Sequence, residues 1–243
     1  MARMVRLLAF GQTDRGHARP NNEDGLLIRP PLYAVADGMG GHRAGEVASR
    51  VALEALSVHL PNPGLAPRSL LDAVRHANQE VYALASQHSE WFGMGTTLTA
   101  ALWDGDLLHI AHVGDSRAYL MCSNVPLRQV TRDHSVISEL VASGLVTPEM
   151  ARLHPQRHVL TRALGVTPEV EIDLHSVPLT PGDRVLLCTD GLSGVISGEE
   201  IEQVLRRPLT PARQVELLVR WANLRGGPDN ITALLLVTEG VRL

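Results

Sequence analysis

The sequence predicts an α+β fold in which two antiparallel β-sheets pack face to face and helices cover their outer faces. Short strand-like runs fall in two clusters along the 243 residues, and a pair of helical stretches follows each cluster. No internal repeat, linker or low-complexity tract separates them. Because chains of this length often form one domain, we expect residues 1–243 to fold as a single domain.

The first strand cluster lies near the N-terminus, with turns at Asn21-Asn22 and Pro30-Pro31. Its expected strands are Leu7–Phe10, Gly25–Ile28 and Leu32–Ala36. The two stretches that follow place apolar residues at helical spacing and are separated by the firm break Pro61-Asn62-Pro63-Gly64. We therefore expect helices over Gly45–Leu60 and Arg68–Ser86.

The second cluster returns to the β pattern after Thr96, and Asp104-Gly105 indicates a hairpin between its first two strands. A helix is expected over Asp133–Ser143, with Asp133 as a candidate N-cap. Two short helices are expected around Glu199–Leu205 and Pro211–Trp221. The strands predicted in this part are Leu98–Trp103, Leu107–Val113, Arg117–Met121, Leu127–Val130, Val170–Leu174, Val185–Cys188 and Ile231–Val237.

One long stretch, Leu145–Gly165, shows no clear period. It contains two prolines, two histidines and three arginines. A segment of this length without evident structure is typical of a functional flap or lid. We therefore expect a flap at about residues 145–165.

Composition excludes several classes of protein. The net charge is −4 with no basic stripe, and aromatic residues make up only 3% of the chain, so no nucleic-acid partner is expected. Every basic residue is arginine, which excludes Schiff-base enzymes and Walker-type P-loops, since both need a lysine. Cys122 and Cys188 lie in apolar runs, as buried thiols do in a reducing compartment. No run has the length of a signal-peptide core or a membrane span, so we expect a cytoplasmic protein without a membrane partner.

Carboxylates occur where packing alone would not require them. In most cases the aspartate adjoins an apolar run, at the point where a strand should give way to a turn. Carboxylates held at strand ends converge only if a cation offsets their repulsion, and hard oxygen ligands suit Mg²⁺ or Mn²⁺. The pattern predicts a multi-metal hydrolase. The segments are Asn21-Asn22-Glu23-Asp24, Asp37-Gly38-Met39-Gly40-Gly41-His42, Gly114-Asp115-Ser116-Arg117, Thr189-Asp190-Gly191 and Asp229-Asn230-Ile231-Thr232.

Taken singly, some segments have a simpler interpretation. Asp115 before Ser116, and Asp229-Asn230 after a Gly-Gly-Pro run, are both typical of turns, and we interpret Asp104-Gly105 as a plain turn. The joint occurrence of the segments in one chain favours the metal interpretation. The histidines expected as surface or strand residues are His17, His76, His88, His109 and His175.

In order and rough spacing these segments resemble one family, the metal-dependent protein serine/threonine phosphatases of type 2C (the PPM family) in their compact bacterial form. Arg19-Pro20 before the first segment, Gly95-Thr96-Thr97 and Leu160–Gly165 add to the resemblance, which runs from about Thr13 to Val237. It implies a four-layer αββα sandwich, two antiparallel β-sheets flanked by helix pairs, with metals at one end. The implied activity is hydrolysis of phosphoserine and phosphothreonine in proteins by direct attack of a metal-bridging water or hydroxide, which counteracts a serine/threonine kinase.

The resemblance also implies roles for individual residues. Asp37 would bridge two tightly bound Mn²⁺ or Mg²⁺ ions, and the Gly38 carbonyl would ligate one of them. Arg19 is placed to bind two phosphate oxygens. The remaining assignments are Asp190 and Asp229 to the other ion's shell, Glu23 and Asp24 to the inner or water-mediated shell, and Asp115 with Asp190 to a weaker third ion.

One position departs from the family pattern. Animal members carry histidine where this chain has Met39, and methionine cannot donate a proton to the leaving oxygen. His42 is the candidate general acid, with a metal-bound water as the alternative. His158 stands in the flap where many relatives have asparagine.

Two other functions compete with this interpretation. A two-metal phosphohydrolase acting on nucleotides or nucleic acid is opposed by the few aromatics and the absence of a basic track. An inactive relative that only binds phosphoproteins would usually lack a metal aspartate, and here all are present. The expected partners are phosphorylated proteins, including a serine/threonine kinase, and we expect a monomer.

Overall fold

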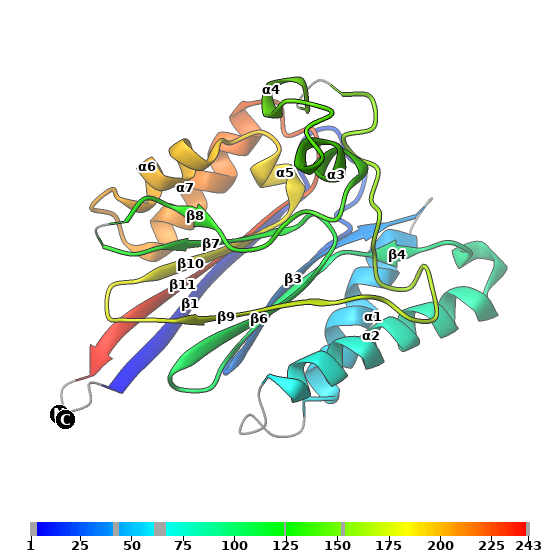
Figure 1. The fold of residues 1–243 in the computed structure, drawn as a ribbon, viewed down its shortest axis with the longest axis horizontal. Coiled ribbons are helices and arrows are strands. Elements are labelled where there is room, and N and C mark those ends of the chain that lie inside the picture. The colour runs from blue at the N-terminus through cyan, green and yellow to red at the C-terminus, as the bar shows by residue number, and fades with distance from the viewer. Residues whose placement is uncertain (1–3, 41–43, 61–66, 124, 152–153, 242–243) are drawn as a thin grey trace.

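The computed structural model describes residues 4–40, 44–60, 67–123, 125–151 and 154–241. In this part of the chain the strands form two antiparallel sheets that pack against each other (Figure 1). His42, the candidate general acid, lies outside the described residues.

The first sheet is formed by the two ends of the chain and three strands from its middle. Its longest strands pair along their whole length, from Met4 opposite Val241 to Asp14 opposite Ile231. The order across the sheet is β1 (Met4–Asp14), β11 (Ile231–Val241), β10 (Arg184–Cys188), β7 (Arg117–Met121) and β8 (Arg128–Gln129).

The second sheet contains two hairpins in succession. The hairpin at Asp104-Gly105 forms as expected: Asp104 Oδ1 accepts hydrogen bonds from the backbone N–H groups of Asp106 and Leu107, and Gly105 has φ +110°. The order is β2 (Asp24–Arg29), β3 (Leu32–Met39), β5 (Leu98–Trp103), β6 (Leu107–Val113) and β9 (Asp173–Pro178), while the short β4 (Gly95–Thr96) pairs with the end of β3.

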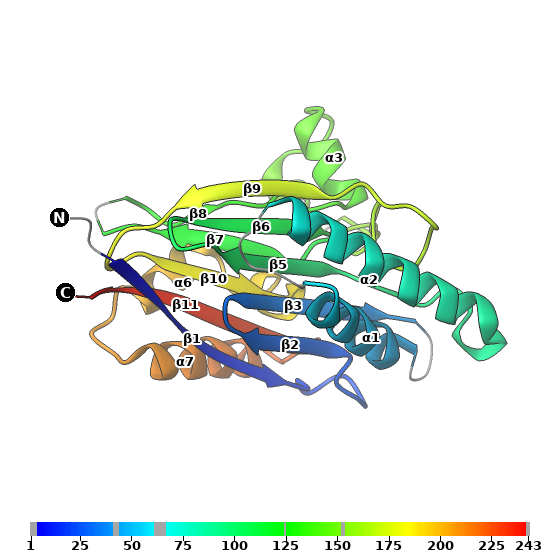
Figure 2. The same ribbon diagram turned by 90° about the horizontal axis from the view of Figure 1, so that it is seen from below.

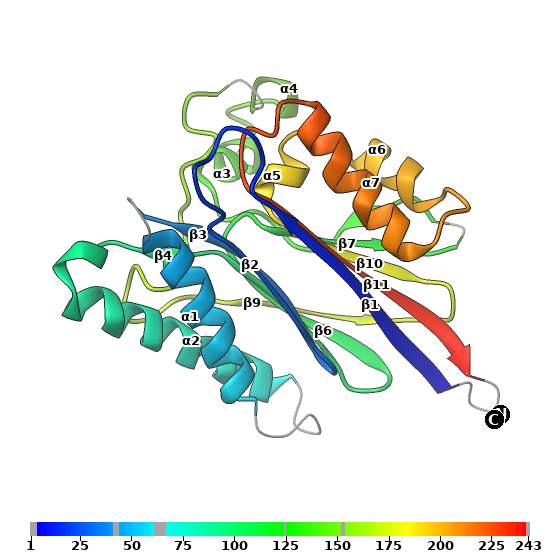
Figure 3. The same ribbon diagram turned by 180° about the vertical axis from the view of Figure 1, so that it is seen from behind.

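Helix pairs cover the outer face of each sheet (Figures 2 and 3). α1 (Ala44–Val58) and α2 (Arg68–Gln87) pack on the second sheet, and α6 (Gly198–Leu205) and α7 (Pro211–Leu224) pack on the first. β3, which lies inside the second sheet, shows why a central strand is mostly apolar. Leu32, Ala34 and Ala36 face α1 and α2, whereas the alternating Tyr33 and Val35 face the other sheet, so both sides of the strand are buried. The predicted four-layer αββα arrangement is confirmed.

Several boundaries differ from the prediction. The strand expected at Val170–Leu174 begins only at Asp173, as β9. The helix expected from Asp133 is α3 (Val136–Ala142), and its N-cap is Ser135, whose hydroxyl accepts from the N–H of Ser138. Asp133 is not the cap because its carboxylate pairs with Arg117. The elements that sequence reasoning did not identify are β4, the 3₁₀ turn Ser89–Trp91, α4 (Pro148–Ala151) and α5 (Asp190–Ser193).

The helices in the described ranges include none with both the length and the apolar character needed to cross a lipid bilayer.

Candidate functional site

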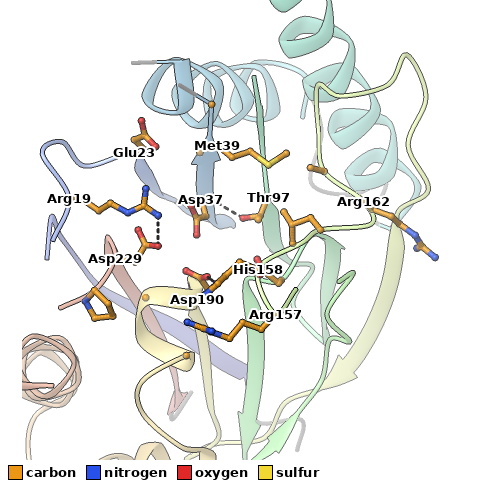
Figure 4. A pocket seen from close by; sticks show the side chains of 18 of the residues that line it. Arg19, Glu23, Asp37, Met39, Thr97, Arg157, His158, Arg162, Asp190 and Asp229 are labelled. Carbon is orange, nitrogen blue, oxygen red and sulfur yellow. Dashed lines mark hydrogen bonds and ion pairs between the residues drawn. The ribbon is translucent and has the colours of Figure 1, made fainter. Parts of the chain in front are cut away.

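A cavity of about 780 Å³ opens at one end of the two sheets (Figure 4). Its walls come from segments far apart in the sequence: the loop before β2, the end of β3, the β6–β7 turn, the start of α5, the loop before β11 and the flap. The sequence-predicted residues that line it are Arg19, Glu23, Asp37, Gly38, Asp115, Asp190 and Asp229. The fold therefore brings these seven candidates together.

Asp37 lies at the end of β3, where Thr97 fixes the backbone. The N–H of Asp37 donates to Thr97 Oγ1 at 2.9 Å, and its carbonyl accepts from the N–H of Thr97 at 2.8 Å. Burial raises the pKa of the Asp37 carboxyl well above its usual value, and the negative charges of Asp24 and Asp190 raise it further. A carboxylate in this setting is stabilised when a cation binds beside it.

Asp24 lies behind the cavity wall and does not line the cavity. Its register partner in the β2–β3 hairpin is Asp37. The hydroxyls of Thr189 and Thr232 donate to Asp24 Oδ2 at 2.8 and 2.7 Å, while Oδ1 is buried without a hydrogen-bond partner among the described residues. Burial raises the pKa of Asp24 to about 7. An unpartnered buried carboxylate oxygen is costly, so a ligand for it is expected.

Asp190 is the first residue of α5, beside the β6–β7 turn that carries Asp115. Asp190 Oδ1 is a second buried oxygen without a partner in the described part of the chain. The pKa of Asp115 is raised to about 7, first by burial and then by the charge of Asp190. These two carboxylates repel each other, which fits a cation held between them.

Asp229 precedes β11 and forms an ion pair with Arg19, the phosphate-binding candidate. Arg19 Nη2 lies 2.8 Å from Asp229 Oδ2, and the Arg19 side chain is 49% exposed at the cavity mouth. Asp229 Oδ1 accepts from the N–H of Asn230. The hydrogen bond to Asp229 raises the pKa of Arg19, so its positive charge is permanent.

Glu23 and the Gly38 carbonyl meet at the start of α1. A Cβ built on Gly45 would lie 2.7 Å from both Glu23 Oε2 and the Gly38 oxygen, so these two oxygens approach the same point. A Cβ on Gly38 would lie 2.0 Å from the Gly45 carbonyl, which excludes any side chain there. The chain thus brings a carboxylate and a carbonyl oxygen together, as hard cations require.

The donor set fits hard divalent ions. All the donors named above are oxygens, and two buried carboxylate oxygens are without partners among the described residues. In these residues no group of three or more His, Cys, Asp or Glu side chains is arranged to hold a metal alone. Ions such as Mg²⁺ and Mn²⁺ prefer oxygen ligands and complete their shell with waters, which matches this arrangement better than a closed zinc site with nitrogen and sulfur ligands.

Comparison with known proteins identifies the family and the fold. A model of protein phosphatase 2C matches residues 23–235. The chain belongs to the protein phosphatase 2C family. The serine/threonine phosphatase stp of Listeria monocytogenes is 40% identical over 236 residues, 93% of this chain and 93% of that protein. PstP of Mycobacterium tuberculosis is 44% identical over 97% of this chain and 46% of that longer protein.

Solved structures of protein phosphatase 2C relatives superpose closely on this chain. The crystal structure of the M. tuberculosis phosphatase PstP/Ppp has a TM-score of 0.89 and 41% identity, covering 97% of this chain and 99% of that one. A structure of the PstP catalytic domain in complex with two manganese ions has the same TM-score, identity and coverage. The manganese ions bound by that relative agree with the oxygen donor set described above.

In this protein phosphatase 2C chain, the buried carboxylates make stability depend on pH. Burial raises the pKa of Asp24 and Asp115 from the usual 3.8 to about 7. Their contribution to stability is fully present below about pH 4 and is lost as the pH rises through about 7. We expect the melting temperature of the metal-free protein to fall between about pH 5 and about pH 8, and Mn²⁺ to reduce this fall. Thermal melts with and without Mn²⁺ measure both slopes, and equal slopes would contradict the carboxylate cluster.

The sequence segments include the threonines that support the site, but no role was predicted for them. Thr97 holds the end of β3, and Thr189 and Thr232 hold Asp24 from strands that are distant in the sequence. Thr189 was recognisable beside Asp190, but its bond to Asp24 spans 165 positions. Arg162 also lines the cavity, yet its guanidinium points away from the carboxylates (Figure 4) toward its ion pairs with Asp173 and Glu171.

Proposed function

We propose that this chain hydrolyses phosphoserine and phosphothreonine in proteins, in a reaction that requires divalent metal ions. One observation carries the proposal: acidic side chains from five separate segments face one cavity with an arginine at its mouth. Bound divalent ions would supply positive charge that lowers the pKa of a coordinated water and neutralises phosphoryl oxygens. The carboxylates hold that charge, and Arg19 holds the phosphate.

We assign the metal-holding residues as follows. Asp37 contributes to two positions for tightly bound metal ions. The Gly38 carbonyl and Glu23 complete one of them, and Asp190 and Asp229 complete the other. Asp115 shares Asp190 in a weaker third position, and Asp24 supports the cluster from behind. Either Mn²⁺ or Mg²⁺ suits these oxygen donors. The candidates for the general acid are His42 and a metal-bound water, since the thioether of Met39 has no proton to donate.

The reaction class is tested with three substrates, each with and without Mn²⁺. A phosphothreonine peptide should be hydrolysed only when the metal is present, while a phosphotyrosine peptide and a phosphodiester should be poor substrates. EDTA should stop turnover, and Mn²⁺ added back should restore it. Hydrolysis of the phosphothreonine peptide at full rate in EDTA, or preference for the diester, would refute the proposal.

Arg19 should bind the phosphate. Its only ion pair in the described structure is with Asp229, and its exposed guanidinium can turn to two phosphate oxygens. Arg19→Ala should lower kcat/KM by about 10- to 100-fold, the loss expected for charge-assisted hydrogen bonds, with little change in metal affinity. Arg19→Lys should recover only part of the loss, because an ammonium cannot replace the planar fork.

The control for Arg19 is Arg50→Ala, because Arg50 pairs with Glu54 on the exposed face of α1 and does not line the cavity. Steady-state kinetics and Mn²⁺ titration on the three variants separate the two roles. Unchanged kinetics in Arg19→Ala would assign phosphate binding to another group.

The segment 145–165 is proposed to act as a flap that tunes substrate choice. Arg157 and His158 line the cavity, and His158 Nδ1 lies 3.7 Å from Asp190 Oδ2. In the described part of the flap no ion pair or side-chain hydrogen bond holds Arg157, so its charge is available to a protein substrate.

The rest of the proposal follows the family: a single catalytic domain over 1–243, a monomer, and a substrate set that includes a serine/threonine kinase. Location in the cytoplasm stays a prediction.

A further inference from the structure

His134 connects two functional segments that are separated in the sequence. The residue follows β8 and is 6% exposed, and none of the catalytic roles above uses it. On one side it contacts the Gly114-Asp115 turn, and on the other the C-terminal part of the flap. Buried side chains with several polar contacts hold their surroundings in one arrangement.

The contacts to the turn use both polar groups of the Gly114 backbone. The N–H of His134 donates to the Gly114 carbonyl at 2.7 Å, and the N–H of Gly114 donates to His134 Nδ1 at 3.2 Å. Gly114 has φ +107°, and a Cβ there would lie 2.6 Å from the Thr97 side chain, so only glycine fits this position of the turn. The next residue is Asp115, so its position depends on the turn that His134 holds.

The contacts to the flap use the opposite side of the residue. The N–H of Thr161 donates to the His134 carbonyl at 2.9 Å, and the neighbouring Ser135 forms a β-bridge with Leu160. His134 Nε2 lies 3.3 Å from Asp173 Oδ2, and Asp173 Oδ1 accepts from Arg162 of the flap at 3.0 Å. The flap base is thus attached to His134 both through the backbone and through Asp173.

These contacts require one form of the imidazole ring. An N–H group can only donate, so Nδ1 facing Gly114 must be unprotonated, and Nε2 carries the hydrogen that it directs to Asp173. Burial lowers the pKa of His134, which favours this neutral form. The two ring nitrogens therefore act in different directions: Nδ1 holds the turn and Nε2 holds the flap.

We propose that His134 is a positioning residue that fixes the position of the flap relative to the Asp115 turn, so that the flap influences metal binding at Asp115. Its kinetic consequences rest on the proposed phosphatase function, while its structural consequences do not. Loss of a residue that orients a metal carboxylate typically costs about 10- to 100-fold in metal affinity or activity.

Three variants separate the two sides of the ring. His134→Ala removes both contacts, His134→Asn keeps an oxygen near the position of Nδ1, and His134→Gln keeps an amide nitrogen near the position of Nε2. The matched control is the same series at His109, whose side chain is 4% exposed and also uses both nitrogens, toward Ser176 and Asp104. His109 does not line the cavity.

The first readout is hydrogen exchange of the Gly114 and Thr161 amides in the metal-free protein. His134→Ala should accelerate both by about tenfold or more. The Gly114 N–H loses its acceptor Nδ1, and the Thr161 N–H keeps the residue 134 carbonyl as acceptor but lies in a flap base that has lost the link from Nε2 to Asp173. His134→Asn should restore protection mainly at Gly114, and His134→Gln mainly at Thr161. The His109 variants should leave both amides unchanged.

The second readout is kinetic, with p-nitrophenyl phosphate and a phosphothreonine peptide over a range of Mn²⁺. His134→Ala should raise the Mn²⁺ concentration for half-maximal turnover by about 10- to 100-fold and change the ratio of the two rates. If His134→Ala lowers only the free energy of unfolding, as His109→Ala does, and leaves amide exchange and the Mn²⁺ response unchanged, the proposal is wrong. If the wild-type protein shows no Mn²⁺-dependent turnover, the proposed function fails, and amide exchange still decides the role of His134.

Discussion

Asp37→Asn should lower phosphatase turnover by on the order of 10³-fold or more and at the same time stabilise the metal-free protein. Turnover is expected to fall because the carboxylate that we assign to two metal positions is lost, and an amide cannot supply its charge. The same change removes a buried negative group whose pKa is raised by burial and by the neighbouring carboxylates Asp24 and Asp190. Without metal that group only opposes folding near neutral pH, so its loss raises stability.

The matched control is Asp183→Asn. Asp183 is also buried, at 3% exposure, but its carboxylate accepts from the N–H and hydroxyl of Thr180, away from the cavity. This control should lose stability and keep its activity, the opposite of Asp37→Asn. Kinetics with Mn²⁺, together with urea unfolding in EDTA, gives both quantities. An active Asp37→Asn variant would rule out the shared-ligand assignment.

Asp115→Ala should lower turnover at saturating Mn²⁺ by about 100-fold while two metal ions remain tightly bound. In the proposed assignment Asp115 shares only Asp190 as a metal ligand, whereas the tight positions draw on more oxygens, so fewer ligands would make this the weaker site. The fold should be retained, because the N–H and the ring Nδ1 of His134 hold Gly114, and neither contact uses the Asp115 side chain.

The decisive measurement for Asp115 pairs metal stoichiometry by calorimetry with phosphopeptide kinetics on the same variant. Loss of a weak binding event together with the loss of turnover is the expected result. Wild-type turnover at saturating Mn²⁺ would make Asp115 a turn residue only, which is the simpler interpretation that its sequence context allows.

Local pattern predicted most of the elements. Leu98–Trp103, Leu107–Val113 and Arg117–Met121 have the expected bounds, because alternation and an Asp-Gly turn are local signals. The errors arise where a distant partner competes with the local signal. Asp133 resembles an N-cap but pairs with Arg117, so α3 begins after Ser135. α5 begins at Asp190, where the sequence showed only a strand end.

The sequence by itself determined the chemistry of this protein, because acidic residues at strand ends, glycines beside them and the absence of lysine are properties of composition and order. Only the tertiary structure decided which of these groups meet and how each is held. Arg19 and Asp229 are 210 positions apart, and the two threonines that bind Asp24 are 165 and 208 positions from it. Such contacts form only when the two sheets pack, since strand pairing and layer packing bring distant segments to one edge. No local spacing carries that information.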